Sequence, residues 1–235
     1  MKERARAWRN RPLVSRAAHP VRWGSLRRLA PIGAGSGAQR GMPIDRYYVD
    51  RFVQQRAGLV RGRVLEAETP ELARRYGRDV ERVDVLDVDA YNDDATLLAD
   101  LGDAGSLPEA AFDCELLVGV LERVTNLDVA VSNAWRSVAL GGALLVSVPT
   151  VRAVDRTDAG RGVDTWRMLP AGLQAILELR CPDGDVEVEG FGNVLAATAL
   201  LMGVAAEELR PSELDHHDPE HPVVACGCVV KRGPV

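Results

Sequence analysis

The chain has 235 residues, of which 46% are hydrophobic and 27% charged, and its net charge is −5 at pH 7. This length suits one globular α/β domain, and no apolar run is long enough to predict a membrane span. Residues 1–40 hold ten Lys or Arg against one acid, a net charge of +9, which leaves about −14 on residues 41–235. An acidic body of this kind argues against nucleic acid as the main partner.

The basic segment 1–40 is predicted to be a flexible N-terminal extension of a domain that covers residues 41–235. Its glycine-rich last part, 31–41, has the composition of a linker. The segment lacks the apolar core of a secretory signal, and Pro12, Pro20 and Pro31 interrupt any organelle-targeting helix. Contact of this segment with anionic lipid or RNA is the alternative to a solvated extension.

The first predicted element of the domain is a helix that begins at Pro43 and ends before Gly62. Pro43 suits the first helical turn, and Asp45 complements the positive start of the helix. Strands are then predicted over residues 63–67, 82–87 and 96–99, where short apolar runs end at turn residues.

The segment from Ala99 to Pro149 has the clearest pattern in the chain. Two apolar runs of strand length, 114–120 and 143–148, enclose a segment with helical spacing at 129–140. Near-continuous apolar strands that alternate with helices are typical of a parallel sheet buried on both faces. Gly141 and Gly142, just before the second run, are expected to form the turn from helix to strand.

The last third of the chain adds two more strands. A polar loop is expected to about Asp164, followed by a helix over 170–179 and a strand over 186–190. Asn193 is expected to cap a long helix to about Leu209, and the last strand covers 222–231. These elements predict an α/β fold with a doubly wound, mostly parallel seven-stranded sheet and helices on both faces.

The four cysteines are predicted to be free thiols. They fall in or beside predicted strands, and a Cys-x-Cys pair in a strand has poor geometry for a disulfide. This pattern favours a reducing cytoplasm as the location of the protein. The residues are Cys114, Cys181, Cys226 and Cys228.

The order of landmarks between Ala99 and Pro149 resembles the second half of class I S-adenosylmethionine (SAM)-dependent methyltransferases, and the likeness extends more weakly over residues 41–232. Further segments are similar to a methyltransferase type 11-like subgroup associated with glycan-building enzymes. They are Pro43–Tyr48, Trp166–Arg167 with Leu169–Pro170, Phe191–Ala196 and Glu213–Pro219. The resemblance implies a Rossmann-like fold with an antiparallel closing edge. It also implies methyl transfer from SAM to an oxygen or nitrogen of a small molecule or glycan precursor.

Open α/β sheets bind ligands at the carboxyl ends of their strands, and the resemblance places the cofactor there. It implies that Glu66 lies near the methionine amino group and that Glu122 lies beside the methyl sulfur. Asp87 follows Glu66 by 21 positions and would hold the ribose, with Asp89 as its competitor. Acids at strand ends also serve as caps and turn formers, which is the alternative interpretation. The expected cofactor residues are Glu66, Ala67, Asp87, Asp89, Asp100, Leu101 and Glu122.

Two features depart from the family pattern. The turn after Glu66 reads Ala67-Glu68-Thr69-Pro70-Glu71 and contains no glycine, so side chains narrow the room for a cofactor. Arg123 stands where the family motif has histidine, which removes any base role at that position. These departures motivate a second hypothesis, a catalytically silent scaffold that acts as a partner or regulatory subunit. A crevice filled by Glu68, Pro70 or Glu71 would count against an enzyme.

Trp166, Arg167 and Tyr47 are the candidates for substrate binding. Trp166 has the chemistry to stack on a sugar or aromatic face, and Arg167 to hold a phosphate or carboxylate. Tyr47 would close over the cofactor. The alternatives are a core anchor for Trp166, a paired or solvated surface group for Arg167 and helix packing for Tyr47. No catalytic residue is assigned.

The segment Asp215–His221 contains three histidines among carboxylates, which are the residue types of metal sites. Adjacent histidines diverge in an extended chain, and Pro219 and Pro222 stiffen the segment, so a surface loop is expected and no metal is predicted. His216 or His217 as a base toward a hydroxyl substrate is the remaining alternative.

Overall fold

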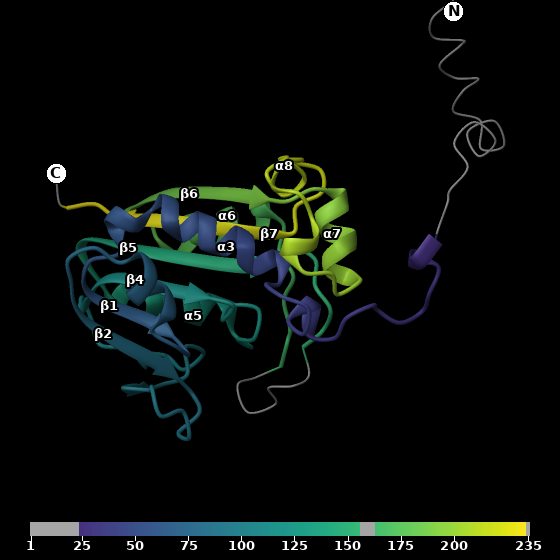
Figure 1. Ribbon diagram of the computed structural model, residues 1–235. Helices are drawn as coiled ribbons and strands as arrows, with labels where there is room; N and C mark the ends of the chain where they lie inside the picture. Colours follow the sequence, from purple (N-terminus) through teal and green to yellow (C-terminus); the bar gives the residue numbers. More distant parts are fainter. Residues whose placement is uncertain (1–23, 156–162, 234–235) are drawn as a thin grey trace, which may run out of the picture. The chain divides into compact units, whose positions relative to one another are not determined.

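The structure is a computed structural model that describes residues 24–155 and 163–233 (Figure 1). The chain forms two compact units, Met1–Pro31 and Ile32–Val235. In the first unit, the described part holds one 3-10 turn, Gly24–Leu26. Most of the predicted flexible extension lies outside the described residues.

A seven-stranded sheet forms the centre of the second unit, with the strand order β3-β2-β1-β4-β5-β7-β6. Strands β1 to β5 pair in parallel, while β7 runs antiparallel between β5 and β6. The predicted α/β sheet is therefore confirmed as seven-stranded and mixed, with its antiparallel strands at one edge. The strands are β1 Gly62–Ala67, β2 Val80–Asp87, β3 Leu97–Leu98, β4 Phe112–Val118, β5 Val138–Pro149, β6 Gly184–Phe191 and β7 Val224–Lys231.

Helices cover both faces of this sheet, and on each face an apolar cluster lies between the helices and the sheet. In Figure 1, α3 crosses in front of the sheet and α5 and α6 lie behind it. None of the helices in the described ranges is long and apolar enough to cross a bilayer. One face carries α3 Ile44–Gln55, α4 Glu71–Tyr76, α7 Val194–Leu201 and α8 Pro211–Leu214, and the other carries α5 Leu127–Ser137 and α6 Pro170–Arg180.

Strand β5 begins earlier than the sequence predicts. Residues 138–140, expected to be helical, are strand, because α5 ends at Ser137 and Val138 pairs with Phe112. The two glycines lie inside β5 and do not form a turn between helix and strand. A Cβ on Gly142 would lie 2.8 Å from a backbone oxygen of β4, at a point where the register of the pair slips. A β-bulge at this point therefore requires glycine.

The helix after Asn193 is shorter than predicted. The predicted cap is confirmed, since the Asn193 side chain accepts a hydrogen bond from the backbone N–H of Ala196 at 3.0 Å. However, α7 ends at Leu201 and not near Leu209. Gly203, with a φ of +69°, turns the chain out of the helix and explains the early end.

Residues 32–41, predicted to belong to a flexible linker, pack on the end of α7. The backbone N–H groups of Ile32 and Gly33 donate to the carbonyl of Met202 at 2.7 and 3.2 Å, and Arg40 donates to Glu208 at 2.7 Å. These contacts form because glycines let two backbones approach closely, and the flexibility of the segment stays a prediction. A side chain on Gly203 would overlap the carbonyl oxygen of Gly33.

Gly203→Ala is expected to lower the free energy of unfolding by about 2 kcal/mol. The new Cβ would be strained at a φ of +69° and would push away residue 33. Urea unfolding of the full chain measures the change. Gly58→Ala is the matched control, because a Cβ at Gly58 meets no atom within 4 Å. Equal losses in the two variants would contradict the close approach as the cause.

All four cysteines are buried and free, as predicted from the sequence. Burial raises the pKa of the Cys181 thiol to about 12 and also raises the pKa of Cys114, Cys226 and Cys228. A thiol with a raised pKa stays protonated and unreactive at neutral pH. These residues therefore act as small apolar side chains of the core.

Candidate functional site

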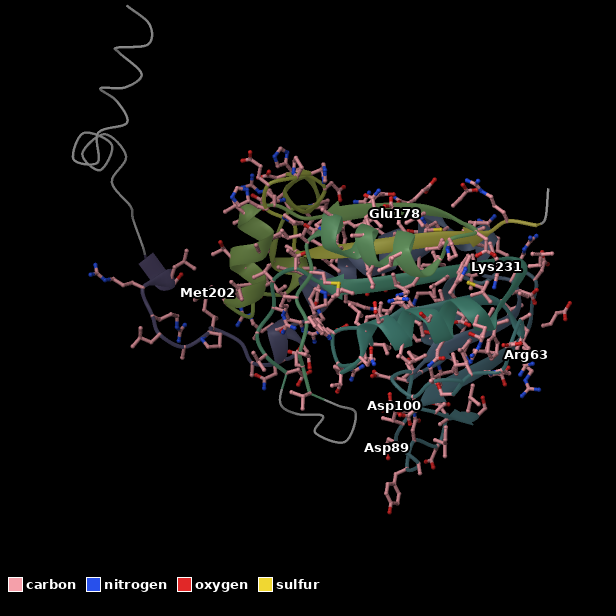
Figure 2. All side chains as sticks on the ribbon, turned by 180° about the vertical axis from the view of Figure 1, so that it is seen from behind. Arg63, Asp89, Asp100, Glu178, Met202 and Lys231 are labelled. Atoms are coloured by element: carbon pink, nitrogen blue, oxygen red, sulfur yellow. The ribbon has the colours of Figure 1, made fainter. Side chains whose placement is uncertain are left out.

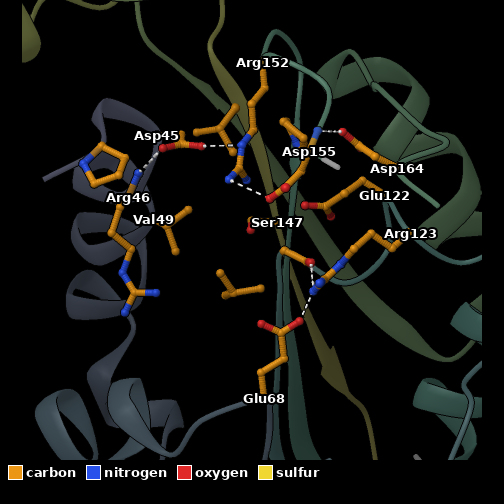
Figure 3. Close-up of a pocket in the computed structure, with 15 residues that line it drawn as sticks. Asp45, Arg46, Val49, Glu68, Glu122, Arg123, Ser147, Arg152, Asp155 and Asp164 are labelled. Carbon is orange, nitrogen blue, oxygen red and sulfur yellow. Dashed lines mark hydrogen bonds and ion pairs between the residues drawn. The ribbon is translucent and has the colours of Figure 1, made fainter. Parts of the chain in front are cut away.

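A pocket of about 350 Å³ opens where β1, β4 and β5 end, against α3 (Figure 3). In an open α/β sheet this is the edge at which ligands bind. Its wall includes apolar side chains such as Val49, Val118 and Val224. Its charged lining consists of three arginines and five acids: Arg46, Arg123, Arg152, Asp45, Glu68, Glu122, Asp155 and Asp164.

An ion pair in the lining of this pocket joins the segments that follow β1 and β4. Arg123 donates to the carboxylate of Glu68 and also to the carbonyl of Gly119, the latter at 2.6 Å. Glu68 has a φ of +66°, which is uncommon for a residue with a side chain. The glycine-free turn therefore places the Glu68 side chain in the crevice, whereas Pro70 and Glu71 do not line it.

Glu122, just beyond β4, is an acid on the inner wall of the pocket. It is 4% exposed, and its Oε2 atom has no hydrogen-bond partner among the described residues. Burial raises the pKa of Glu122 to about 7, although the nearby Arg123 and Arg152 act in the opposite direction. This carboxyl group can therefore take up or release a proton near neutral pH.

A chain of charged contacts closes the side of the pocket beyond β5. Arg152 lies 3.6 Å from the carboxylate of Asp45 and 3.9 Å from that of Asp155. The backbone N–H of Asp155 donates to Asp164 at 2.9 Å, and Arg167 donates to Asp164 at 2.6 Å. The hydrogen bonds from Arg167 lower the pKa of Asp164, so this acid stays ionised.

Glu66 does not line the pocket. Its two carboxylate oxygens accept hydrogen bonds from the backbone N–H groups of Leu72 and Ala73, both at 2.8 Å, in the first turn of α4. Burial raises its pKa to about 7 despite these bonds. The structure thus gives the Glu66 carboxylate a helix-capping contact. Ala67, the next residue, is the last residue of β1.

Asp87 ends β2 and is held by the loop that follows. Its carboxylate accepts from the Asn92 side chain at 2.6 Å and from the backbone N–H of Asp89 at 2.9 Å. Asn92 also donates to the carbonyl of Glu68 at 2.8 Å, so this loop is tied to the turn after β1. The Asp89 carboxylate accepts from the N–H of Tyr91.

Asp100 and Leu101 follow β3 at the same edge of the sheet. The backbone N–H of Ala99 donates to the carbonyl of Asp87 at 3.1 Å, which joins the ends of β2 and β3. The Asp100 carboxylate is exposed and accepts from the N–H of Gly102 at 2.7 Å, while Leu101 is buried. Figure 2 labels Asp89 and Asp100 at this edge. The predicted cofactor residues that follow β2 and β3 therefore lie at one edge of the sheet but do not line the 350 Å³ pocket. They are Asp87, Asp89, Asp100 and Leu101.

Trp166 and Arg167 contact the chain just beyond β4. The indole N–H of Trp166 donates to the carbonyl of Val124 at 2.8 Å, and its backbone N–H donates to that of Glu122 at 3.0 Å. The ring is 36% exposed. The Trp166 indole is thus tied to the backbone beyond β4, and Arg167 is paired with Asp164. Substrate contact by either residue stays a prediction.

Tyr47, the third substrate candidate, lies on α3 but does not line the pocket. Its hydroxyl donates to Asp215 at 2.7 Å. The residues of α3 that do reach the pocket are Asp45, Arg46 and Val49, which sequence reasoning did not select. The sequence signal that could have identified Asp45 and Arg46 is the resemblance of Pro43–Tyr48 to a family segment.

The acidic, histidine-containing loop brings together Asp218, Glu220 and His221, whose ligand atoms lie within 4.8 Å of one another. His221 Nδ1 lies 2.8 Å from the Asp218 carboxylate. All three residues lie within four positions on one surface loop, and His216 and His217 are not part of the group. The expectation of no metal stays a prediction.

Solved structures give the clearest comparison. No family model matches the chain, and no curated protein matches it. A putative methyltransferase of Haloferax volcanii, in complex with the activator Trm112, is 14% identical; 80% of this chain and 92% of that chain align with a TM-score of 0.54. A SAM-dependent methyltransferase of Mesorhizobium loti is 17% identical, over 80% of this chain and all of that chain, with a TM-score of 0.51.

The [4+2]-cyclase SpnF is 18% identical, over 94% of this chain and 92% of that chain, with a TM-score of 0.54. The fold therefore accommodates more than one chemistry. At these identities the likeness concerns the fold. The chain has the α/β, Rossmann-like fold of SAM-dependent methyltransferases, built on a mixed seven-stranded sheet.

Proposed function

We propose that this protein binds SAM at the carboxyl ends of β1 to β4 and transfers its methyl group to an oxygen or nitrogen of a small molecule or glycan precursor. The observation that carries the proposal is the 350 Å³ pocket at this edge, beside the acids at the ends of β2 and β3, in a methyltransferase fold. The four free thiols favour a reducing cytoplasm as its location.

The residues at this edge fit the chemistry of SAM. Asp87 would accept hydrogen bonds from the ribose, in competition with Asn92, and the exposed Asp100 would accept from the adenine amino group. Glu122, which lines the pocket, has an oxygen without a hydrogen-bond partner in the part of the chain that the structure describes. The Glu68–Arg123 ion pair must separate to admit the methionine end.

When bound, SAM supplies a methyl group that is electrophilic because it is attached to a positive sulfonium. The acceptor atom forms the bond to the methyl carbon, and the bond from that carbon to sulfur breaks with its electron pair left on the sulfur. The proton that the acceptor loses passes to Glu122 or to water. The pocket walls align the two molecules and exclude water, which is the main contribution that such a transfer needs.

Calorimetric titration with SAM and with S-adenosylhomocysteine tests the proposal. Asp87→Ala and Asp100→Ala are each expected to weaken binding about 30-fold or more, because each removes a charged acceptor of cofactor hydrogen bonds. Asp93→Ala, an exposed acid of the loop after β2, is the matched control and should bind normally. Absence of heat with either cofactor at millimolar concentration would contradict the proposal.

A catalytically silent scaffold is the second candidate, and the Glu68–Arg123 pair favours it. The pair places two side chains in the crevice, where many methyltransferases of this kind are expected to have only backbone. One structural neighbour is a complex with an activator protein, so the fold accommodates a protein partner. A chain that binds no cofactor but forms a stable complex with a partner would support this candidate.

A further inference from the structure

The arginines that line the pocket are already held by carboxylates. Arg46 donates to Asp50 at 2.8 Å, and Arg123 donates to Glu68. Arg152 lies between Asp45 and Asp155, at 3.6 and 3.9 Å. Two guanidinium atoms of the lining, Arg46 Nη2 and Arg152 Nε, are buried without a hydrogen-bond partner among the described residues. With three guanidinium groups against five acids, the lining still holds more acids than cations.

Glu122 differs from the other acids of the lining. It is 4% exposed, and its Oε2 atom has no hydrogen-bond partner among the residues that the structure describes. Figure 3 shows its carboxylate directed toward the centre of the pocket. A buried acceptor without a partner costs free energy, so a donor that enters the pocket would be bound at this atom.

We infer that the pocket receives an amine of the substrate beside Glu122, so that nitrogen is the methyl acceptor. This inference rests on the proposed function and narrows it. An ammonium group has only donors and carries a positive charge, which suits an orphan carboxylate among acids. A phosphate or carboxylate acceptor would bring a second negative charge next to the Glu122 carboxylate, and a neutral hydroxyl would gain no charge interaction with it.

The groups that face Glu122 agree with this choice. Arg123 and Arg152 favour its ionised form, Asp164 opposes it, and burial opposes it most, which leaves the pKa of Glu122 at about 7. An ammonium beside it would favour the ionised form and lower that pKa. The ionised carboxylate is then also the nearest group to receive the proton that the amine must lose before its lone pair attacks the methyl carbon.

Propylamine, 1-propanol and propionate are matched probes of ligand charge. The pKa of Glu122, followed by carbon NMR of its side-chain carboxyl group in the full chain, is expected to fall by about one unit with propylamine. It should not change with 1-propanol or propionate. Glu122→Gln should weaken propylamine binding about tenfold, whereas Glu178→Gln, an exposed acid on α6, should leave it unchanged.

Equal binding of propylamine and 1-propanol, preferential binding of propionate, or no detectable binding of propylamine would each overturn the inference. Titration of the same samples with SAM separates it from the proposed function. Binding of SAM without preference for the amine contradicts the amine site alone. A chain that binds propylamine but does not bind SAM supports the amine site and contradicts methyl transfer.

Discussion

Glu68→Gly is expected to strengthen SAM binding about tenfold, which corresponds to about 1.4 kcal/mol. Under the proposed function, SAM displaces the ion pair of Glu68 and Arg123 from the pocket, and the cost of separating the pair reduces the observed affinity. The variant removes the carboxylate from the crevice. Glycine also adopts a φ of +66° without strain, so the turn after β1 keeps its shape. Calorimetric titration with SAM measures the change.

Asp79→Gly is the matched control for this variant. Asp79 is a second acid with a positive φ, +55°, but it lies in the turn before β2, at the other end of the strands. Both variants relieve backbone strain, and only Glu68→Gly opens the crevice. Unchanged SAM affinity in Glu68→Gly, or an equal gain in Asp79→Gly, would exclude the ion pair as the barrier.

Glu115→Gln is expected to raise the free energy of unfolding by about 3 kcal/mol at pH 7. Glu115 lies fully buried in β4, and burial raises its pKa from 4.5 to about 8. The folded chain therefore holds this proton at pH 7, whereas the unfolded chain has released it. The stability due to the protonated group is complete below pH 4.5 and is lost as the pH rises to about 8. Glutamine stays neutral throughout.

Urea unfolding between pH 5 and pH 9 measures this difference, which should grow by about 1.4 kcal/mol per pH unit and level off above pH 8. The raised pKa values of Glu66 and Glu122 give slopes of the same sign, but the variant retains both. Glu109→Gln, an acid with a 74% exposed side chain, is the control. Parallel stability curves for Glu115→Gln and the wild type would show that Glu115 ionises normally.

The strands of this fold could be predicted because burial on both faces makes them apolar runs between turn residues. The same property caused the error at Val138–Leu140, since a short apolar segment fits a helix and a buried strand equally well. The early end of α7 and the packing of residues 32–41 depend on the contact between Gly33 and Gly203. Such a contact between distant glycines has no local signal in the sequence.

The candidate site was predicted less completely than the fold. Parallel topology brings strand ends to one edge, which is why Asp87, Asp100 and Glu122 could be selected. Chain order does not reveal which acids satisfy local backbone groups, so capping was only the alternative interpretation for Glu66. Arg152 reaches the pocket from a loop and Arg46 from a helix, and their positions depend on long-range packing.

The place of β7 has a consequence for biosynthesis. Residues 224–231 leave the ribosome after all the other described strands, yet they lie between β5 and β6, and β6 pairs with β7 alone. During translation β6 therefore has no neighbour, and the apolar edge of β5 is open to the wrong partners. The sheet of a nascent chain is therefore incomplete until residues 224–231 have been synthesised and have inserted between β5 and β6.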